Sequence, residues 1–522
     1  MYKRIESIVF CMIFLIGLSL PAVRINFQPG RVSKTENRAL ANPAKLYNDD
    51  GTKNTNFKRD FENWFNDSIG MRAALARTDG KIQYYLFHQL KDMPLGTNGV
   101  LAPYQDLADL QHRNLYTEEQ LDSIADAYQT VYTYLSARGI PMLFMQCWDK
   151  QTIYPEQYPD TIQVFGDVSR TQQVEEAVKQ KTDVPVVSLM QLLKQAKEKY
   201  MVYPEWSDPW HWTMRGSFIA YQELMKNICT VTQKQYRILQ ENDFDLTPID
   251  TGKTFFESIH REEMTEAFSV KNVTWRDMPQ KLTYMPADIY AHHIRYIENP
   301  AADNEDTLLI LGDSYIHDSM ILQGLCSAFH TVVMYNGAAV ADRNFLHMVE
   351  EYDPDLVLFE QAERESQIRY AGVVSAAQYL HAQAYEPGTV IRFYGEDNNS
   401  LQYVLNGMSA PDEPYTWTVG ARSTLYMTMD VPEGTPLCMH IRTEDAYGDR
   451  QRVIVRINRQ KVYEGIVEGK QELEIPFVMP AVHGLSFRLE YPDAISPFEN
   501  KDSVDIRPLS LAIREMEIVK AQ

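Results

Sequence analysis

The chain has 522 residues, of which 44% are hydrophobic, and it carries a formal net charge of -21 at pH 7. A single hydrophobic core rarely serves so long a chain, so we expect about two to four domains. The excess of acidic residues argues against nucleic acid and against an anionic membrane surface as partners. A neutral or cationic polymer is compatible with this charge.

The cysteines exclude one class of metal site. The sequence contains 5 of them, and none belongs to a CxxC pair, which argues against a zinc knuckle. Free buried thiols and a single disulfide both remain open. We expect neither a metal nor a cofactor.

Residues 1–24 predict an N-terminal membrane anchor or signal segment. Lys3 and Arg4 precede an uncharged apolar run at residues 7–23, close to the shortest length of about 17 residues for a membrane-spanning helix. The basic flank predicts that the N-terminus stays inside and that the body is exported. An uncleaved anchor is favoured because the cleavage pattern near residues 21–23 is poor. A cleaved signal peptide, which would also export the body, is the alternative.

Residues 25–116 read as a linker followed by a helical segment. Residues 24–60 are polar and rich in turn formers, and a helix is expected near residues 57–66. Apolar residues then recur at helical spacing, among them Ile69 and Ile82.

Residues 117–384 predict an α/β domain with a doubly wound parallel sheet, because strand and helix patterns alternate. Thr117 and Gln120 form a capping-box pattern that opens the first helix. Continuous apolar runs of this kind are typical of buried parallel strands. Strands are expected at residues 140–147, 184–189, 307–311, 331–335 and 356–360, and helices at 117–137, 172–180, 190–200, 316–329 and 341–352. Residues 230–300 read as an irregular insertion of short strands and loops.

Residues 385–522 change to period-two patterns that are punctuated by turn residues such as Pro432 and Gly434. Strands are expected at residues 452–458, 472–477 and 485–491. This texture predicts a separate all-β sandwich. The segment resembles the jelly-roll modules of polysaccharide-modifying enzymes, which implies carbohydrate binding. A purely structural sandwich is the alternative.

The tripeptide Gly312-Asp313-Ser314 lies where an apolar strand ends and a helix begins. Ligands bind at that edge of α/β sheets, and a serine there can project its hydroxyl into the crevice. The N–H groups at the start of the helix would suit an oxyanion. The alternative is that Ser314 merely caps the helix.

Asp208 and His211 stand three residues apart, just before a helix that Thr213 is expected to cap. A serine nucleophile needs a base that accepts its proton, and an imidazole base needs a carboxylate that fixes its tautomer. One loop can supply both groups. Ser314, His211 and Asp208 are therefore the candidate catalytic triad, and a packed histidine beside a surface aspartate is the alternative.

Together these motifs resemble the SGNH hydrolase superfamily. Their order, with Asp208 and His211 before Ser314, is similar to that of the alginate O-acetyltransferase group, the AlgX/AlgJ-like proteins and their DHHW relatives. Further stretches resemble this group in the same order, at residues 36–40, 57–72, 149–150, 154–155, 352–355 and 359–364. The resemblance implies an SGNH-like α/β domain and a serine acyltransferase.

One departure from this group concerns the carboxylate. Its members space the two residues as D-x-H-W, whereas here Pro209 occupies the usual Asp position and Asp208 lies three residues before His211. We expect the triad to survive with the general SGNH spacing. The alternative is that the orienting carboxylate has been lost.

Other residues are candidates for the walls of the site. Asn336 and Gly312 are candidate oxyanion donors, and Tyr315 is expected to line the pocket. Trp210 and Trp212 are either core anchors or a platform for a sugar substrate. Glu360, at the end of another strand, is expected to pair with Arg364.

We therefore expect acetyl transfer to a hydroxyl of an exported cell-surface polysaccharide through an acyl-Ser314 intermediate. The resemblance implies a polysaccharide acceptor and a membrane-embedded acyl donor protein as partners. The body would lie outside the cell membrane. A carbohydrate esterase that removes acetyl groups is one alternative. A non-catalytic polysaccharide-binding or scaffold protein of an export complex is the other.

Overall fold

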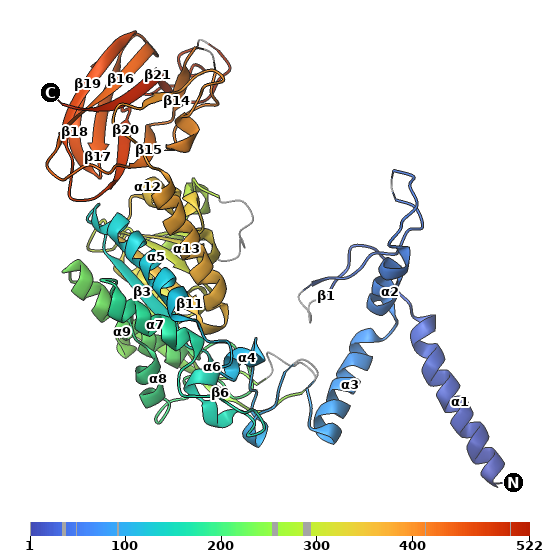
Figure 1. Cartoon of the computed structure of the whole chain (residues 1–522). Coiled ribbons are helices and arrows are strands. Elements are labelled where there is room, and N and C mark those ends of the chain that lie inside the picture. The colour runs from blue at the N-terminus through green and yellow to red at the C-terminus, as the bar shows by residue number, and fades with distance from the viewer. Residues whose placement is uncertain are drawn as a thin grey trace.

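The computed structural model describes residues 2–33, 38–48, 50–90, 93–252, 259–285, 294–412, 414–501 and 503–521. Figure 1 shows helices of the N-terminal part to one side of a layered α/β body, and C-terminal β-sheets at one end of that body. Glu36 and Asn37, which belong to the stretches quoted for the family resemblance, lie outside the described residues.

The N-terminal part contains helices where the sequence predicted them. It consists of α1 (Tyr2–Val23), β1 (Val32–Ser33), β2 (Arg38–Ala39), α2 (Phe57–Ser68) and α3 (Arg72–Phe87). Within the described residues, a search for a helix with the length and apolarity that a bilayer requires finds none. The membrane anchor therefore stays a prediction.

Seven strands form the sheet of the α/β body, in the order β4-β3-β11-β9-β10-β8-β7. The strands from β4 to β10 in this order are parallel, which confirms the predicted α/β class, whereas β8 and β7 pair antiparallel at one edge. The sheet is therefore mixed, because the segment that we read as an insertion supplies β7 and β8. The strands are β3 (Met142–Cys147), β4 (Val186–Val187), β7 (Arg276–Asp277), β8 (Arg295–Glu298), β9 (Thr307–Gly312), β10 (Thr331–Asn336) and β11 (Leu356–Ala362). The same segment also forms a separate hairpin of β5 (Phe244–Asp250) and β6 (Met264–Val270).

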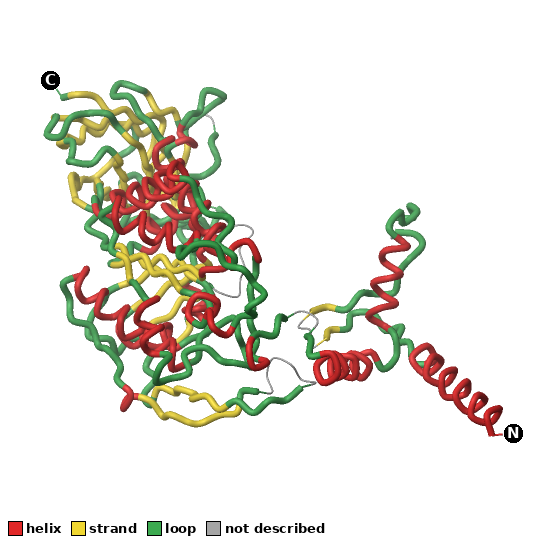
Figure 2. The backbone as a smooth tube through the Cα atoms, turned by 60° about the horizontal axis from the view of Figure 1, so that its bottom comes forward, coloured by secondary structure: helices red, strands yellow, loops and turns green. Residues whose placement is uncertain are grey.

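Helices cover both faces of this sheet (Figure 2). One hydrophobic core lies under α8, α9 and α11, and a second lies under α5, α7, α12 and α13. The helix predicted at 316–329 is divided in two, because Ser319 caps a new helix by accepting a hydrogen bond from the N–H of Ile321 at 3.2 Å. The helices are α4 (Leu107–Leu110), α5 (Glu118–Ser136), α6 (Lys150–Ile153), α7 (Arg170–Lys181), α8 (Met190–Ala196), α9 (Met214–Thr232), α10 (Ser314–His317), α11 (Met320–Ala328), α12 (Arg343–Tyr352) and α13 (Ser366–Ala382).

The C-terminal part is all-β, as predicted. Two five-stranded antiparallel sheets share one hydrophobic core. The first contains β12 (Val390–Arg392), β14 (Thr416–Val419), β16 (Pro436–Ala446), β19 (Gln471–Val478) and β21 (Leu509–Lys520). The second contains β13 (Val404–Asn406), β15 (Arg422–Thr428), β17 (Gln451–Ile457), β18 (Gln460–Val467) and β20 (Gly484–Glu490). The jelly-roll likeness and the boundaries between domains stay predictions.

The cysteines are all free thiols. The sequence left both free thiols and a single disulfide open, and the structure contains the free thiols.

Candidate active site

Ser314 lies at the turn from β9 into α10, at the carboxyl edge of the parallel strands. Asp313 shapes this turn, because its carboxylate accepts hydrogen bonds from the N–H groups of Tyr315 and Ala362, both at 2.9 Å. Position 312 favours glycine, since a Cβ there would lie 2.8 Å from Glu360 Oε2 and would force that side chain to move. The nucleophile turn is thus fastened to the neighbouring strand β11.

Glu360 supports the nucleophile turn from within the sheet. Its side chain is buried, and its Oε2 accepts a hydrogen bond from the N–H of Asp313 at 2.8 Å. Burial and the carboxylate of Asp313 raise the pKa of Glu360 well above its ordinary range. The ion pair that we expected between Glu360 and Arg364 is replaced by one between Arg364 and Asp149.

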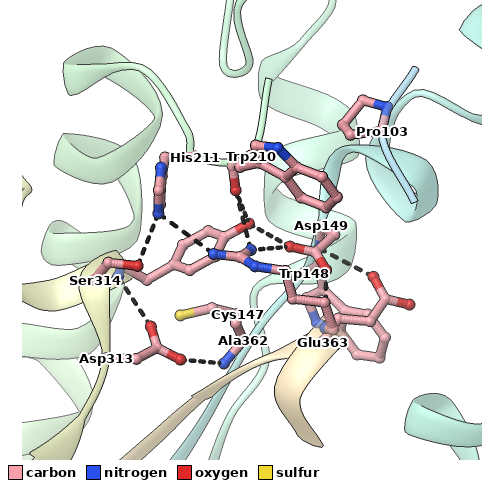
Figure 3. Close-up of polar contacts among 12 residues, drawn as sticks. Pro103, Cys147, Trp148, Asp149, Trp210, His211, Asp313, Ser314, Ala362 and Glu363 are labelled. Carbon is pink, nitrogen blue, oxygen red and sulfur yellow. Dashed lines mark hydrogen bonds and ion pairs between the residues drawn. The ribbon is translucent and has the colours of Figure 1, made fainter. Parts of the chain in front are cut away.

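The loop before α9 brings the predicted base to the nucleophile. His211 Nε2 lies 2.7 Å from Ser314 Oγ (Figure 3), and His211 Nδ1 lies 2.8 Å from Asp208 Oδ2. With its proton on Nδ1, facing the carboxylate, a neutral imidazole offers Nε2 as the acceptor for the serine hydroxyl. The hydroxyl of Thr213 accepts from the N–H of Gly216 at 3.1 Å and caps α9, as expected. The spacing of three residues therefore produces the geometry of a triad.

Two buried side chains hold this loop, and sequence reasoning missed both roles. The carboxylate of Glu263 accepts hydrogen bonds from the N–H groups of residues 205–207, at 2.5, 2.8 and 2.8 Å. Lys150 Nζ donates to the carbonyl oxygens of Pro204 at 2.8 Å and Leu101 at 2.9 Å. Glu263 lies in the segment that we read as an insertion. No sequence pattern there linked Glu263 to the loop before α9 that carries Asp208 and His211, which we call the base loop.

A buried ionic cluster lies beside His211 (Figure 3). Arg364 Nη2 is 3.3 Å from His211 Nε2, and Arg364 Nη1 is 2.5 Å from Asp149 Oδ1. Tyr315 is fully buried, and its hydroxyl donates to Asp149 Oδ1 at 2.7 Å. The prediction that Tyr315 lines the pocket is therefore corrected, because its side chain supports the cluster from beneath.

Glu363 extends this cluster toward α6. Its Oε2 accepts from the N–H of Asp149 at 3.0 Å, and its Oε1 accepts from the hydroxyl of Thr152 at 2.7 Å. Burial, followed by the charge of Asp149, raises the pKa of Glu363 to about 8. Glu363 therefore keeps its proton at neutral pH.

The candidate oxyanion donors occupy two different environments. The N–H of Tyr315 and the two that follow it donate to Asp313, so these groups at the start of α10 are already bonded. Asn336 ends β10 directly beside Gly312 in the parallel register, and its Oδ1 accepts from Arg369 Nη1 at 2.7 Å. Asn336 and Gly312 both lie at the predicted edge of the sheet. Their oxyanion role stays a prediction.

The two tryptophans beside His211 differ in exposure. Trp212 is buried and packs against Tyr315, with 4.8 Å between ring centroids. Trp212 is thus a core residue, the first of the two alternatives that the sequence left open. Trp210 is partly exposed, and Arg364 lies over its ring at 5.7 Å. Trp210 alone of this pair stays a candidate for substrate contact.

No curated protein sequence matches the chain. Among solved structures, PatB1 of Bacillus cereus is 17% identical, and the match covers 48% of this chain and 92% of PatB1 with a TM-score of 0.37. The O-acetyltransferase domain of AlgJ from Pseudomonas putida is 14% identical, with 53% and 92% covered and a TM-score of 0.34. AlgX of Pseudomonas aeruginosa is 10% identical, with 86% and 99% covered and a TM-score of 0.34.

A family model confirms the resemblance that the motifs predicted. Residues 104–282 match the model described as "SGNH hydrolase-like domain, acetyltransferase AlgX". The matched segment contains Asp208 and His211 and ends before Ser314. Over these residues, the chain is similar to the SGNH hydrolase-like acetyltransferases.

Proposed function

We propose that this protein is a serine O-acetyltransferase that acts on a polysaccharide. The observation that carries the proposal is the 2.7 Å contact between His211 Nε2 and Ser314 Oγ, with Asp208 2.8 Å from the other ring nitrogen. The family model that matches residues 104–282 describes an acetyltransferase. That match supports acetyl as the transferred group.

In the first half-reaction, His211 takes the proton of the Ser314 hydroxyl while Oγ attacks the carbonyl carbon of an acetyl donor. The tetrahedral intermediate collapses when the donor's leaving group departs with the proton that His211 returns. In the second half-reaction, a sugar hydroxyl gives its proton to His211 and attacks the acetyl-serine ester. Ser314 leaves with that proton, so the enzyme is restored.

The charge of Arg364 suits the tetrahedral intermediate. Its guanidinium lies 3.3 Å from His211 Nε2, and Asp149 fixes its position from the other side. A positive group that is already in place stabilises negative charge that develops on the reacting carbonyl oxygen. We therefore assign Arg364 to transition-state stabilisation.

The test uses the full chain with 4-nitrophenyl acetate as donor, with and without an oligosaccharide acceptor. We expect an acetyl adduct on Ser314 by intact mass, absent from Ser314→Ala, and acetylated oligosaccharide among the products. If wild type and Ser314→Ala release nitrophenol equally and neither carries the adduct, the enzyme proposal fails.

A carbohydrate esterase is the second candidate function, and it is supported by the solvent exposure of the triad. The side chains of His211 and Asp208 are 29% and 50% exposed, so water can reach the acyl-enzyme. The same assay separates the two activities. Acetate as the sole product, whichever acceptor is present, would identify the esterase.

The non-catalytic alternative requires a serine and a histidine that are out of reach of each other. A separation of 2.7 Å between Ser314 and His211 weighs against it.

Our proposal for the cellular context has three parts, which are an export complex, a membrane-embedded acyl donor and a tether at residues 1–24. Cell fractionation with and without residues 1–24 tests the tether.

Carbohydrate binding by the C-terminal part also stays a proposal. Three partly exposed aromatic rings gather there, with Trp417 between Tyr415 and Tyr447 at centroid distances of 5.7 and 6.1 Å. Such rings offer apolar faces with polar edges. Loss of affinity for polysaccharide in Trp417→Ala would support this role.

A further inference from the structure

A cavity lies at the same edge of the sheet as the triad. Its volume is about 420 Å³, within the range of about 300–1,000 Å³ that is usual for ligand pockets. It is lined by segments that follow β3 and β4 and by the start of α7. Only β11 separates β3 from β9, which carries Ser314. At the usual strand spacing, two strands span about 10 Å.

Polar contacts join this cavity to the catalytic base, and Figure 3 shows the part of the chain that runs from Glu363 and Asp149 to His211. Thr152, on the cavity wall, donates to Glu363, and Glu363 accepts from the N–H of Asp149, at 2.7 and 3.0 Å. Asp149 pairs with Arg364, whose Nη2 lies 3.3 Å from His211 Nε2. A chain of fixed polar groups therefore connects Thr152 on the cavity wall with His211.

His112 on the cavity wall has one feature that the fold does not explain. Among the described residues, its Nδ1 is buried and has no hydrogen-bond partner. A bound ligand would supply the missing partner for Nδ1.

The remaining lining residues favour a hydroxylated ligand. Gln151 and Lys194 offer donors, and Asp160 and Asp167 offer acceptors. Tyr158 contributes part of a ring to the same wall, while its hydroxyl donates to a backbone carbonyl. Two carboxylates outnumber one ammonium group, so the charge of the lining favours a neutral or amino sugar over an anionic one.

We propose that this cavity binds a short stretch of the acceptor polysaccharide, composed of neutral or amino sugars, and holds it beside acetyl-Ser314. The inference rests on the proposed transferase function and adds the acceptor class to it. The residues that select the acceptor are then separate from those that form the acyl-enzyme.

Direct binding tests the cavity without any chemistry. Full-length Ser314→Ala is titrated calorimetrically with chitosan, cellulose and galacturonic acid oligomers of equal length. We expect the cationic oligomer to bind at least about ten-fold more tightly than the anionic one. Asp160→Asn combined with Asp167→Asn should weaken binding of the chitosan oligomer about ten-fold. Tighter binding of the galacturonic acid oligomer, or unchanged affinity in the double variant, overturns the inference.

The matched control removes two carboxylates at the opposite edge of the sheet, by Asp303→Asn combined with Glu305→Gln in the loop before β9. This control should leave the affinity for chitosan oligomers unchanged, and an equal loss in both double variants would attribute the effect to general charge and overturn the inference.

Transfer assays separate failure of the cavity from failure of the proposed function. With Ser314 intact, Gln151→Ala should raise the acceptor KM while the rate of Ser314 acetylation by 4-nitrophenyl acetate stays unchanged. Gln323→Ala, in a different cavity of about 260 Å³ beside His317, is the control. Absence of acetyl-Ser314 from the wild type would refute the transferase proposal, while the titrations would still decide what the cavity binds.

Discussion

The two loops that form the triad are stabilised in different ways. The nucleophile turn is held by the adjacent strand of its own sheet, since Asp313 bonds to β11 and Gly312 allows the close approach of Glu360. The base loop is held by a residue from elsewhere, because Glu263, just before β6, accepts the N–H groups of residues 205–207. The carboxylate in that loop, Asp208, is 50% exposed.

This difference separates the stability of the folded sheet from the catalytic activity of the triad. Formation of the nucleophile turn is coupled to formation of the parallel sheet itself. The base loop depends on a few long-range hydrogen bonds, so it can be displaced while the sheet stays folded. Substitutions in the two loops should therefore affect activity and stability in different proportions.

Removal of the base has the largest expected effect on acetylation of Ser314. His211→Ala should lower the acylation rate about 10²–10⁴-fold, because the serine then has no acceptor for its proton. The melting temperature should change little, since the side chain is partly exposed. Burst kinetics with 4-nitrophenyl acetate measure the rate. The control is His317→Ala on α10, whose histidine pairs with Asp318 at 2.7 Å. Equal losses in the two variants would contradict the assignment.

Loss of the loop anchor comes next. Glu263→Ala should lower the acylation rate on the order of 10²-fold, the effect of displacing a catalytic group by about 1 Å. It leaves three N–H groups without their acceptor, and each such loss costs about 1–3 kcal/mol when the group stays buried. The neighbouring Glu262 is exposed, so Glu262→Ala is the matched control. An unchanged rate in Glu263→Ala would show that the base loop holds its own shape.

The parts that the sequence predicted correctly depend on local patterns. The apolar runs that form β9, β10 and β11 begin and end close to the residues where these strands begin and end. The strand-to-helix turn after β9 places Ser314 at the carboxyl end of that strand. The capping pattern at Thr117 depends on neighbours within four residues, and the structure contains that capping box. Asp208 and His211 also share one short loop. Short-range chemistry of this kind is visible in a linear sequence.

The parts that it missed depend on partners that are distant in the chain. The bond of Glu263 to residues 205–207 spans more than 50 positions, with |i−j| from 56 to 58. Arg364 reaches His211 across 153 positions. No periodicity marks such pairs. The short strands β7 and β8 lie within residues 230–300, where the sequence predicted short strands without placing them.

Crowding of the nucleophile turn should have a smaller effect. Gly312→Ala places a Cβ 2.8 Å from Glu360 Oε2, and overpacking of a buried site typically destabilises a protein by about 1–3 kcal/mol. We expect a lower melting temperature with an acylation rate reduced on the order of ten-fold. Gly337→Ala is the control, because the atom nearest to its Cβ, in the side chain of Arg369, would lie 3.3 Å away. Equal melting temperatures for the two variants would argue against the tight approach.

The smallest effect on acylation is expected at Glu363, which shares the buried cluster without touching the triad. Its pKa is raised from 4.5 to about 8. Below pH 4.5 the carboxyl is protonated in both the folded and the unfolded chain, so it has no effect on the free energy of unfolding. Between these two pH values the unfolded chain releases the proton that the folded chain keeps. Stability therefore falls as the pH rises through this window.

Glu363→Gln removes that titration and also one acceptor oxygen. The variant should be about 1 kcal/mol less stable than wild type at pH 5, and its stability should then fall less steeply than that of wild type up to pH 8. Urea unfolding at pH 5, 6.5 and 8 measures both slopes, with Glu119→Gln on the exposed face of α5 as the control. Parallel slopes for Glu363→Gln and wild type would mean that Glu363 is ionised in the folded protein. The buried cluster would then carry one more negative charge beside Asp149. The positive charge of Arg364 would be neutralised by that carboxylate, and Arg364 would stabilise the intermediate at Ser314 less.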